Sequence, residues 1–140
     1  MTYPVDRLLA SLEQIRDLSE PAVHEVHGGY RQSKRIEPFG WVLMDYAPVK
    51  TAWLSWIEPG GYVKPHRDAA PWYERWQIPV ITAGRMTING VDVDQQPGVP
   101  FQVEHWLTHE VVNDTDHPRV HLVLDRKIIA HEGTAGFVLG

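Results

Sequence analysis

Short runs rich in Val, Ile, Thr and Trp, each ended by Gly, Pro or Asn, make up most of the chain from about Trp41 onward. Turn signals stand at Pro59-Gly60-Gly61, Ala83-Gly84, Asn89-Gly90, Pro97-Gly98 and Asn113-Asp114. The runs predict strands near 41–46, 51–58, 62–68, 74–82, 85–89, 99–105, 109–113, 119–125 and 135–139. Short strands in this number are typical of an antiparallel sandwich or barrel. The sequence therefore predicts a mainly β fold, with a jelly roll as the commonest form.

The N-terminal part of the chain carries the pattern of one helix. Leu8, Leu12 and Ile15 recur at helical spacing and Pro21 stops the pattern, which predicts a helix over 4–20. We expect its apolar side to pack against one sheet. No strand is predicted within residues 22–40. With 140 residues and no repeat, linker or low-complexity segment, the chain is predicted to be a single domain over 1–140, with its β core at about 41–139.

Composition excludes several classes of function. The formal net charge is −5 and no Lys/Arg run interrupts it, which argues against a nucleic-acid partner. The chain has no cysteine, so disulfides, thiolate zinc sites and a cysteine nucleophile are excluded. No apolar run is long enough to span a membrane and no signal peptide is apparent. We therefore expect a cytoplasmic protein with a small-molecule or peptide substrate; the oligomeric state is not predicted.

Period-two alternation turns several polar side chains toward the interior of the predicted barrel. In 101–113 the odd positions are mostly apolar, and His109 is one of them. In 119–125 the residues Arg119 and His121 share one face, opposite an apolar face. The side chains placed inward in this way are Ser55, Arg75, Gln77, His109, Arg119 and His121. Buried polar groups without partners are costly, so we expect these side chains to face a partner or a ligand.

His66, Asp68 and His109 form the first candidate site. His66 and Asp68 lie two apart in an extended segment, so their Cα atoms are about 6.6 Å apart on one face. Two imidazoles and one carboxylate are the ligand set of non-haem Fe(II) oxygenases, which leave the opposite positions open. The alternative is a surface His-x-Asp pair plus an unrelated core histidine. His105 is left out, because four residues of strand would place it about 13 Å from His109.

The second candidate site consists of Arg119, Ser55, Arg75 and Gln77. Arg119 opens an apolar strand, and a guanidinium binds a carboxylate through two parallel hydrogen bonds. Arg119 is therefore predicted to hold the far carboxylate of a keto acid, with Ser55 as an added hydroxyl donor. Arg75 and Gln77 are predicted to hold the substrate or the keto-acid head. The alternatives are a surface salt bridge for Arg119, a small strand residue for Ser55 and a solvated strand face for Arg75 and Gln77.

Taken together, these segments resemble the aspartyl/asparaginyl β-hydroxylase family of Fe(II)- and 2-oxoglutarate-dependent dioxygenases. The resemblance runs from about 53 to 125. It rests on Pro65-His66-Arg67-Asp68, on Arg75-Trp-Gln-Ile-Pro79, on Trp106-x-x-His109-Glu-Val-x-Asn113 and on Arg119-x-His-Leu-Val-Leu-Asp125.

The resemblance implies a double-stranded β-helix, with His66, Asp68 and His109 as catalytic iron ligands. It also implies that Arg119, aided by Ser55, binds the distal carboxylate of 2-oxoglutarate. Arg75 falls where family members contact cosubstrate or substrate carboxylates, and Gln77 falls where some members carry a histidine.

The predicted function is hydroxylation of an aliphatic C–H bond in an amino acid, peptide or related small carboxylate, with release of succinate and CO₂. Fe(II) and 2-oxoglutarate are the predicted cofactors. Two alternatives stay open. A cupin-type metal enzyme, either an isomerase or a cosubstrate-free dioxygenase, would share the barrel and the metal but would not need Arg119. A non-catalytic module would bind the metal or keto acid without consuming oxygen.

Overall fold

The computed structural model describes residues 1–15, 20–21, 28–68 and 73–128. The helical elements are α1 (Val5–Glu13), η1 (Glu37–Phe39), α2 (Gly40–Leu43) and η2 (Met44–Tyr46). The strands are β1 (Glu20–Pro21), β2 (Gly28–Ser33), β3 (Val49–His66), β4 (Tyr73–Ile81), β5 (Arg85–Ile88), β6 (Val91–Asp92), β7 (Phe101–Val103), β8 (His109–Val112) and β9 (Arg119–Lys127). Within the described ranges, no helix has the length and apolar composition needed to cross a bilayer.

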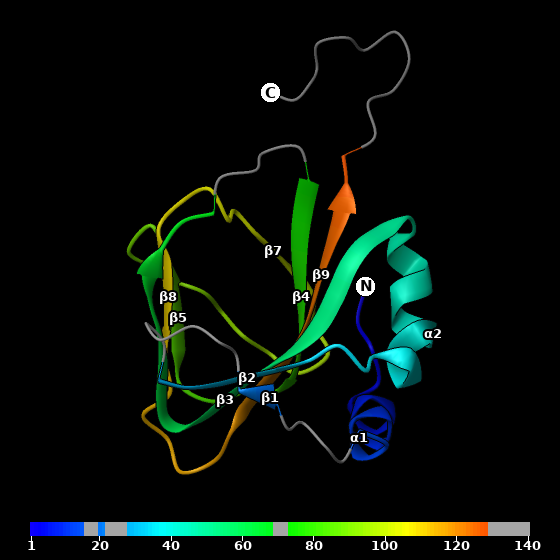
Figure 1. Ribbon diagram of the computed structural model, residues 1–140, viewed down its shortest axis with the longest axis horizontal. Coiled ribbons are helices and arrows are strands. Elements are labelled where there is room, and N and C mark those ends of the chain that lie inside the picture. The colour runs from blue at the N-terminus through cyan, green and yellow to red at the C-terminus, as the bar shows by residue number, and fades with distance from the viewer. Residues whose placement is uncertain (16–19, 22–27, 69–72, 129–140) are drawn as a thin grey trace, which may run out of the picture.

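All recorded strand pairs are antiparallel, and the sheet curls into a half-barrel of the jelly-roll type (Figure 1). The hydrogen-bonded order is β6-β5-β8-β3-β9-β4-β7, and β2 adds to the other edge of β3. Strand β3 joins the two parts of the sheet, β6-β5-β8 and β9-β4-β7, because its first part pairs with β9 and its last part pairs with β8. The predicted mainly β jelly-roll fold is therefore confirmed.

The bend in the middle of β3 comes from Pro59-Gly60-Gly61. The sequence predicts a turn between two strands here, whereas the structure keeps one strand and bends it. Gly60 has a φ of +79°, a left-handed conformation that favours glycine. A Cβ atom on Gly61 would lie 2.8 Å from the Glu58 carbonyl oxygen, so no larger residue fits there.

Asn113 fixes this bend to the rest of the barrel. Its fully buried side-chain amide donates to the carbonyl oxygens of Ile57 (3.0 Å) and His117 (2.9 Å). Its backbone N–H donates to the Gly61 carbonyl at 2.9 Å, and its own carbonyl accepts from Gly60 N–H at 2.7 Å. One side chain therefore ties the middle of β3 to the turn that leads into β9.

Replacing Asn113 with alanine is expected to lower the free energy of unfolding by about 1–3 kcal/mol, because a buried carbonyl would lose its donor. Urea unfolding followed by circular dichroism measures this loss. Asp114→Ala, at the exposed neighbouring position, is the matched control and should change stability by less than about 0.5 kcal/mol. Equal effects of the two substitutions would show that the Asn113 amide does not hold the bend.

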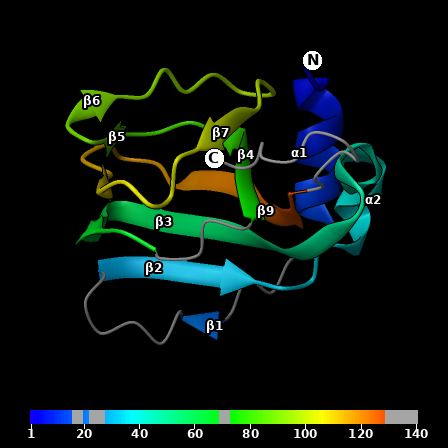
Figure 2. The same ribbon diagram turned by 90° about the horizontal axis from the view of Figure 1, so that it is seen from above.

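The helices cover the outer face of the sheet, on one side of the molecule in both views (Figures 1 and 2). Between the helices and the sheet lies the larger of two apolar cores. It is built from buried side chains of the N-terminal and helical segments and of β3, β4 and β9. They are Tyr3, Leu8, Leu12, Ile15, Phe39, Val42, Tyr46, Leu54, Ile78, Val80, Val120, Leu122 and Leu124. The predicted packing of the N-terminal helix on one sheet is confirmed.

The inner face of the half-barrel holds a second, smaller apolar cluster. Its buried members are Ile57, Val63, Met86, Val103 and Val111. The larger core packs on the outer face, so the inner face is left for this cluster and for polar side chains.

Several element boundaries differ from the predictions. The helix ends at Glu13 rather than at residue 20. Beyond it, the N–H groups of Gln14 and Ile15 donate to the carbonyl oxygens three residues earlier, those of Ser11 and Leu12, and the chain is extended again at 20–21. Residues 41–46 form α2 and η2 instead of a strand. A short apolar run does not distinguish helix from strand, and here it packs onto the sheet as helix.

Residues 28–33 form β2, although no strand is predicted there. Because β2 pairs with β3, the sheet begins before the predicted start of the β core at 41, and among the described residues its last strand ends at Lys127. The predicted strand at 135–139 lies outside the described residues.

Candidate metal centre and its cavity

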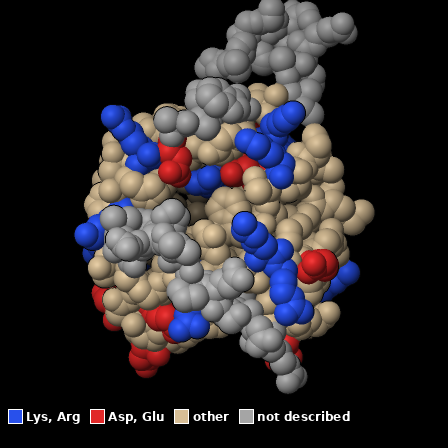
Figure 3. Space-filling model, in the orientation of Figure 1, with Lys and Arg blue, Asp and Glu red and all other residues tan. Residues whose placement is uncertain are grey.

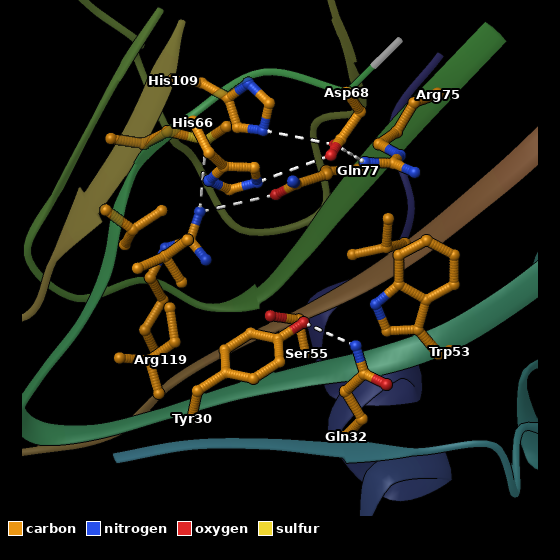
Figure 4. A pocket seen from close by; sticks show the side chains of 15 residues that line it. Tyr30, Gln32, Trp53, Ser55, His66, Asp68, Arg75, Gln77, His109 and Arg119 are labelled. Carbon is orange, nitrogen blue, oxygen red and sulfur yellow. Dashed lines mark hydrogen bonds and ion pairs between the residues drawn. The ribbon is translucent and has the colours of Figure 1, made fainter. Parts of the chain in front are cut away.

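The two histidines and the aspartate predicted as ligands come together at one rim of the barrel (Figure 4). His66 ends β3 and His109 begins β8, and the two residues are direct partners in the strand register. Their ring centroids are 4.3 Å apart. Asp68 lies two residues beyond His66, with Oδ1 3.8 Å from His66 Nε2 and Oδ2 3.7 Å from His109 Nε2. One ligand atom from each residue lies within 4.8 Å of the others, so the three can hold one metal ion.

The protonation pattern of both imidazoles suits metal binding. His66 Nδ1 lies 2.8 Å from the Lys64 carbonyl oxygen, and His109 Nδ1 lies 2.9 Å from that of Leu107. A carbonyl oxygen only accepts, so each Nδ1 carries the proton. In the neutral ring Nε2 then bears the lone pair, on the side that faces Asp68. Fixing the tautomer through Nδ1–H is how metal-binding histidines are usually oriented.

Burial keeps His109 in its neutral form. The exposed fraction of its side chain is only 7%, and this burial lowers the pKa of His109 despite the hydrogen bond to Leu107. The neighbouring His66 lowers the pKa further, while Asp68 acts against it. A metal ion competes with protons for imidazole, so a lowered pKa extends metal binding to more acidic solution.

A cavity of about 230 Å³ extends from this cluster into the half-barrel. Every inward side chain predicted as a site residue lines it, namely Ser55, His66, Asp68, Arg75, Gln77, His109 and Arg119. On the face shown in Figure 3, basic side chains of the described residues are separated by acidic and uncharged ones. Among the described residues on the face in Figure 3, no single basic area gathers.

Arg119 lies at the inner end of the cavity and is the most unusual group in it. Its side chain is only 1% exposed, and within the described residues it makes no ion pair. Nε donates to Gln95 Oε1 at 2.9 Å, and Nη2 has long contacts with Gln77 Oε1 (3.4 Å) and Met86 Sδ (3.5 Å). Burial lowers the pKa of Arg119 to about 9, so the guanidinium is still a cation at neutral pH. The surface salt bridge considered from the sequence is not formed with any residue that the structure describes.

Gln77 connects this inner end to the His-Asp-His cluster. Its Oε1 accepts from His121 Nδ1 at 2.7 Å and faces Arg119, which leaves the amide nitrogen as a donor toward the cavity (Figure 4). Ser55 lies across the cavity on β3, in register with His121 on β9. The prediction that polar side chains of β3, β4 and β9 alternate toward the interior of the barrel is therefore confirmed.

Arg75 also lines the cavity, but protein carboxylates already engage its donors. Nε and Nη2 donate to the two oxygens of Asp125 at 2.9 and 3.1 Å, and Nη1 donates to Asp68 Oδ2 at 2.8 Å. Arg75 therefore bridges Asp68 and Asp125, and its contact with a substrate or keto-acid carboxylate stays a prediction.

Sequence reasoning missed several residues that line the cavity or hydrogen-bond to the side chains that line it. Tyr30 and Gln32 reach the cavity from β2, and their spacing of two was the only signal for them. Asp125 shares the inward face of β9 with Arg119, so alternation alone was enough to find it. Gln95 lies outside any strand and carries no periodic signal. His105 is buried and stacks on Tyr73 with centroids 4.5 Å apart, outside the metal cluster as predicted.

His121 makes the stability of the protein depend on pH. Burial, together with nearby Arg119, lowers its pKa well below the usual value of 6.5. The unfolded chain binds a proton at His121 below about pH 6.5 and the folded chain does not, so the free energy of unfolding rises with pH in this range. Between pH 7 and 5 the metal-free protein should lose stability, by up to about 1.4 kcal/mol per pH unit from this group. Urea unfolding of His121→Asn should show a shallower dependence, and an unchanged dependence would contradict the assignment.

The fold and the cluster together define a jelly-roll protein of the cupin type with a His-Asp-His group at its rim. A family model described as aspartyl/asparaginyl beta-hydroxylase matches residues 33–128. The chain therefore belongs to the aspartyl/asparaginyl β-hydroxylase family. A comparison with curated protein sequences gives no match.

Solved structures share the fold at low sequence identity. A prolyl-4-hydroxylase from Pseudomonas putida is 19% identical with a TM-score of 0.63, over 91% of this chain and 89% of that one. A predicted oxalate decarboxylase from Thermotoga maritima is 13% identical with a TM-score of 0.53, over 71% and 81%. A cupin-2 domain from Rhodospirillum rubrum is 10% identical with a TM-score of 0.52, over 74% and 65%. These likenesses establish the fold and nothing further.

Proposed function

We propose that this protein is an Fe(II)- and 2-oxoglutarate-dependent hydroxylase. It would hydroxylate an aliphatic C–H bond of an amino acid, a peptide or a related small carboxylate, releasing succinate and CO₂. Membership of the aspartyl/asparaginyl β-hydroxylase family supports this reading. The observation that carries it is the presence of two complementary features in one cavity, a cluster that suits a divalent metal and a buried arginine with no carboxylate partner among the described residues.

Arg119 argues for an anionic ligand. A buried cation without an opposite charge is costly, and the cost falls when a ligand supplies the missing carboxylate. A guanidinium pairs with a carboxylate through two parallel hydrogen bonds. Arg119 and the His-Asp-His group line the same cavity, with Gln77 between them (Figure 4). A short dicarboxylic keto acid, with its keto end at the metal and its far carboxylate at Arg119, matches this layout.

Six of the cavity residues then have a role in the proposed reaction. His66, Asp68 and His109 would hold Fe(II), and their two fixed tautomers support this. Arg119 and Ser55 would bind the distal carboxylate, and the Gln77 amide nitrogen would donate to the keto-acid head. When bound, iron and 2-oxoglutarate supply the oxidative decarboxylation that drives hydroxylation. The protein orients both and keeps water out of the cavity.

The opposite wall of the cavity is proposed to receive the substrate. Tyr30 and Gln32 enter from β2, and the Gln32 amide donates to the Tyr30 hydroxyl at 2.9 Å. Trp53 Nε1 is a buried donor without a hydrogen-bond partner among the described residues. An aromatic wall with hydrogen-bonding groups fits a polar substrate whose C–H bond must be held near the metal.

Succinate release under air tests the proposal without knowledge of the substrate. Wild-type protein supplied with Fe(II) and 2-oxoglutarate should form succinate slowly, because such hydroxylases turn over their cosubstrate even when uncoupled. His66→Ala should lower the rate at least 100-fold, while His117→Ala, at an exposed histidine outside the cavity, should not change it. Binding of metal and 2-oxoglutarate without any succinate would favour the non-catalytic module. Full turnover of an Arg119 variant would favour the cupin-type enzyme.

A further inference from the structure

Arg75 is held by protein groups on several sides of its guanidinium. Nε and Nη2 form a two-pronged pair with Asp125, whose side chain is only 8% exposed. Arg75 on β4 and Asp125 on β9 are direct partners in the strand register, so the backbone ladder holds both ends of the pair. Trp53 and Tyr73 lie against the guanidinium, with ring centroids 5.2 and 5.7 Å away. The guanidinium is therefore fixed on several sides.

The remaining arm of Arg75 reaches a predicted metal ligand. Nη1 donates to Asp68 Oδ2 at 2.8 Å, the shortest contact that the carboxylate makes with any neighbouring side chain described here. Asp68 lies beyond the end of β3, so no strand ladder fixes it. Its backbone N–H donates to the His105 carbonyl at 2.8 Å, but its side chain is 34% exposed and depends on Arg75 for its orientation.

We propose that Arg75, held by Asp125, is a positioning residue that orients Asp68 and restricts it to one metal contact. With Oδ2 occupied by Arg75, Oδ1 remains for the ion. A carboxylate that bound through both oxygens would fill an additional position. If three protein ligands and a two-point keto acid held the metal, a single oxygen from Asp68 would leave one of six positions free for oxygen. This inference rests on the proposed function, since it concerns how the same metal is held.

The charges agree with positioning rather than with capture of an anionic substrate. Arg75 and Asp125 carry opposite charges, so the pair orients Asp68 without adding net charge beside the ion. A substrate carboxylate would have to displace one of two protein carboxylates already bound to Arg75. Arg119, by contrast, has no such partner within the described residues. The two arginines of the cavity therefore have different tasks.

Mn(II) affinity tests the proposal without turnover, and electron paramagnetic resonance of unbound Mn(II) measures it. Asp125→Asn, Arg75→Met and the double variant are each expected to bind Mn(II) about 10- to 100-fold more weakly than wild type. The double variant removes one positive and one negative charge, so its loss cannot come from net charge. Because both substitutions break the same interaction, the double variant should lose little more than either single one.

The matched control is Arg67→Met, which removes an exposed cation next to Asp68 and should leave Mn(II) affinity within about twofold. Circular dichroism melting checks that each variant is folded. If charge alone mattered, Arg75→Met would tighten Mn(II) binding, which would overturn the proposal.

Unchanged Mn(II) affinity in folded Asp125→Asn and double variants would also overturn it, while wild-type binding of Mn(II) and 2-oxoglutarate would leave the proposed function standing. Weaker 2-oxoglutarate binding with unchanged Mn(II) affinity would assign Arg75 to the cosubstrate instead. A wild-type protein that binds no Mn(II) would overturn both proposals.

Discussion

Replacing Arg119 with methionine is expected to weaken 2-oxoglutarate binding at least 25-fold and, at the same time, to make the protein more stable. Methionine has a similar length but no charge. The substitution therefore removes a buried cation that makes no ion pair within the described residues. Exchange of buried charged groups for apolar side chains often stabilises by about 1–4 kcal/mol. Removing one partner of a buried charged pair costs about 2–5 kcal/mol of binding, or at least 25-fold in Kd. The unliganded variant should therefore melt several degrees higher than wild type.

Calorimetric titration in the presence of Mn(II) separates this effect from general damage. The matched ligand is 2-oxopentanoate, which has the same chain length and keto-acid head but no distal carboxylate. Wild type should strongly prefer 2-oxoglutarate, and Arg119→Met should bind the two compounds equally weakly. Arg85→Met, at a β5 cation with 72% of its side chain exposed, should change neither preference nor stability. A variant that keeps the preference for 2-oxoglutarate would remove Arg119 from the cosubstrate site.

His109→Ala is expected to lower divalent metal affinity by at least 100-fold. It removes one of the three side chains that converge on the metal position, and changes to outer partners of a ligand alone cost 10- to 100-fold. Cosubstrate binding should fail with the metal, because the keto-acid head needs the ion. Mn(II) titration followed by electron paramagnetic resonance gives the affinity directly.

His105→Phe is the matched control for this variant. His105 is also buried and lies four residues earlier, but it stacks on Tyr73 instead of joining the cluster, and phenylalanine keeps that stacking. The control should keep wild-type Mn(II) affinity. If His105→Phe lost the metal and His109→Ala kept it, the proposed ligand set would be wrong.

The inward face of each main strand could be predicted from the sequence, because alternation is a local property. His66 and Asp68 share a face through their spacing, and Arg119 shares one with His121. Both placements hold in the structure. Alternation over 101–113 predicts an inward His109 only if this segment is one continuous extended run. The structure has two strands with a turn at 104–108 between them, yet His109 still lies inward.

The partners of these side chains could not be predicted, because they depend on which strands become neighbours. Arg75 and Asp125 are 50 residues apart and meet only because β4 lies beside β9. From the sequence, Arg75 has the character of a ligand-binding cation, whereas this long-range pairing supplies Asp125 as its protein partner. Strand β2 was missed for a similar reason. Its two glycines and its polar residues match no strand pattern, and pairing with β3 provides its order.

Visible absorption of the anaerobic protein with Fe(II) and 2-oxoglutarate tests the central claim most directly. A keto acid that chelates iron through its carboxylate and carbonyl gives a charge-transfer band that neither component gives alone. The account predicts a band in wild type that requires both additions, persists in His105→Phe and disappears in His109→Ala. Absence of the band in wild type, with no measurable binding of either iron or 2-oxoglutarate, would contradict it.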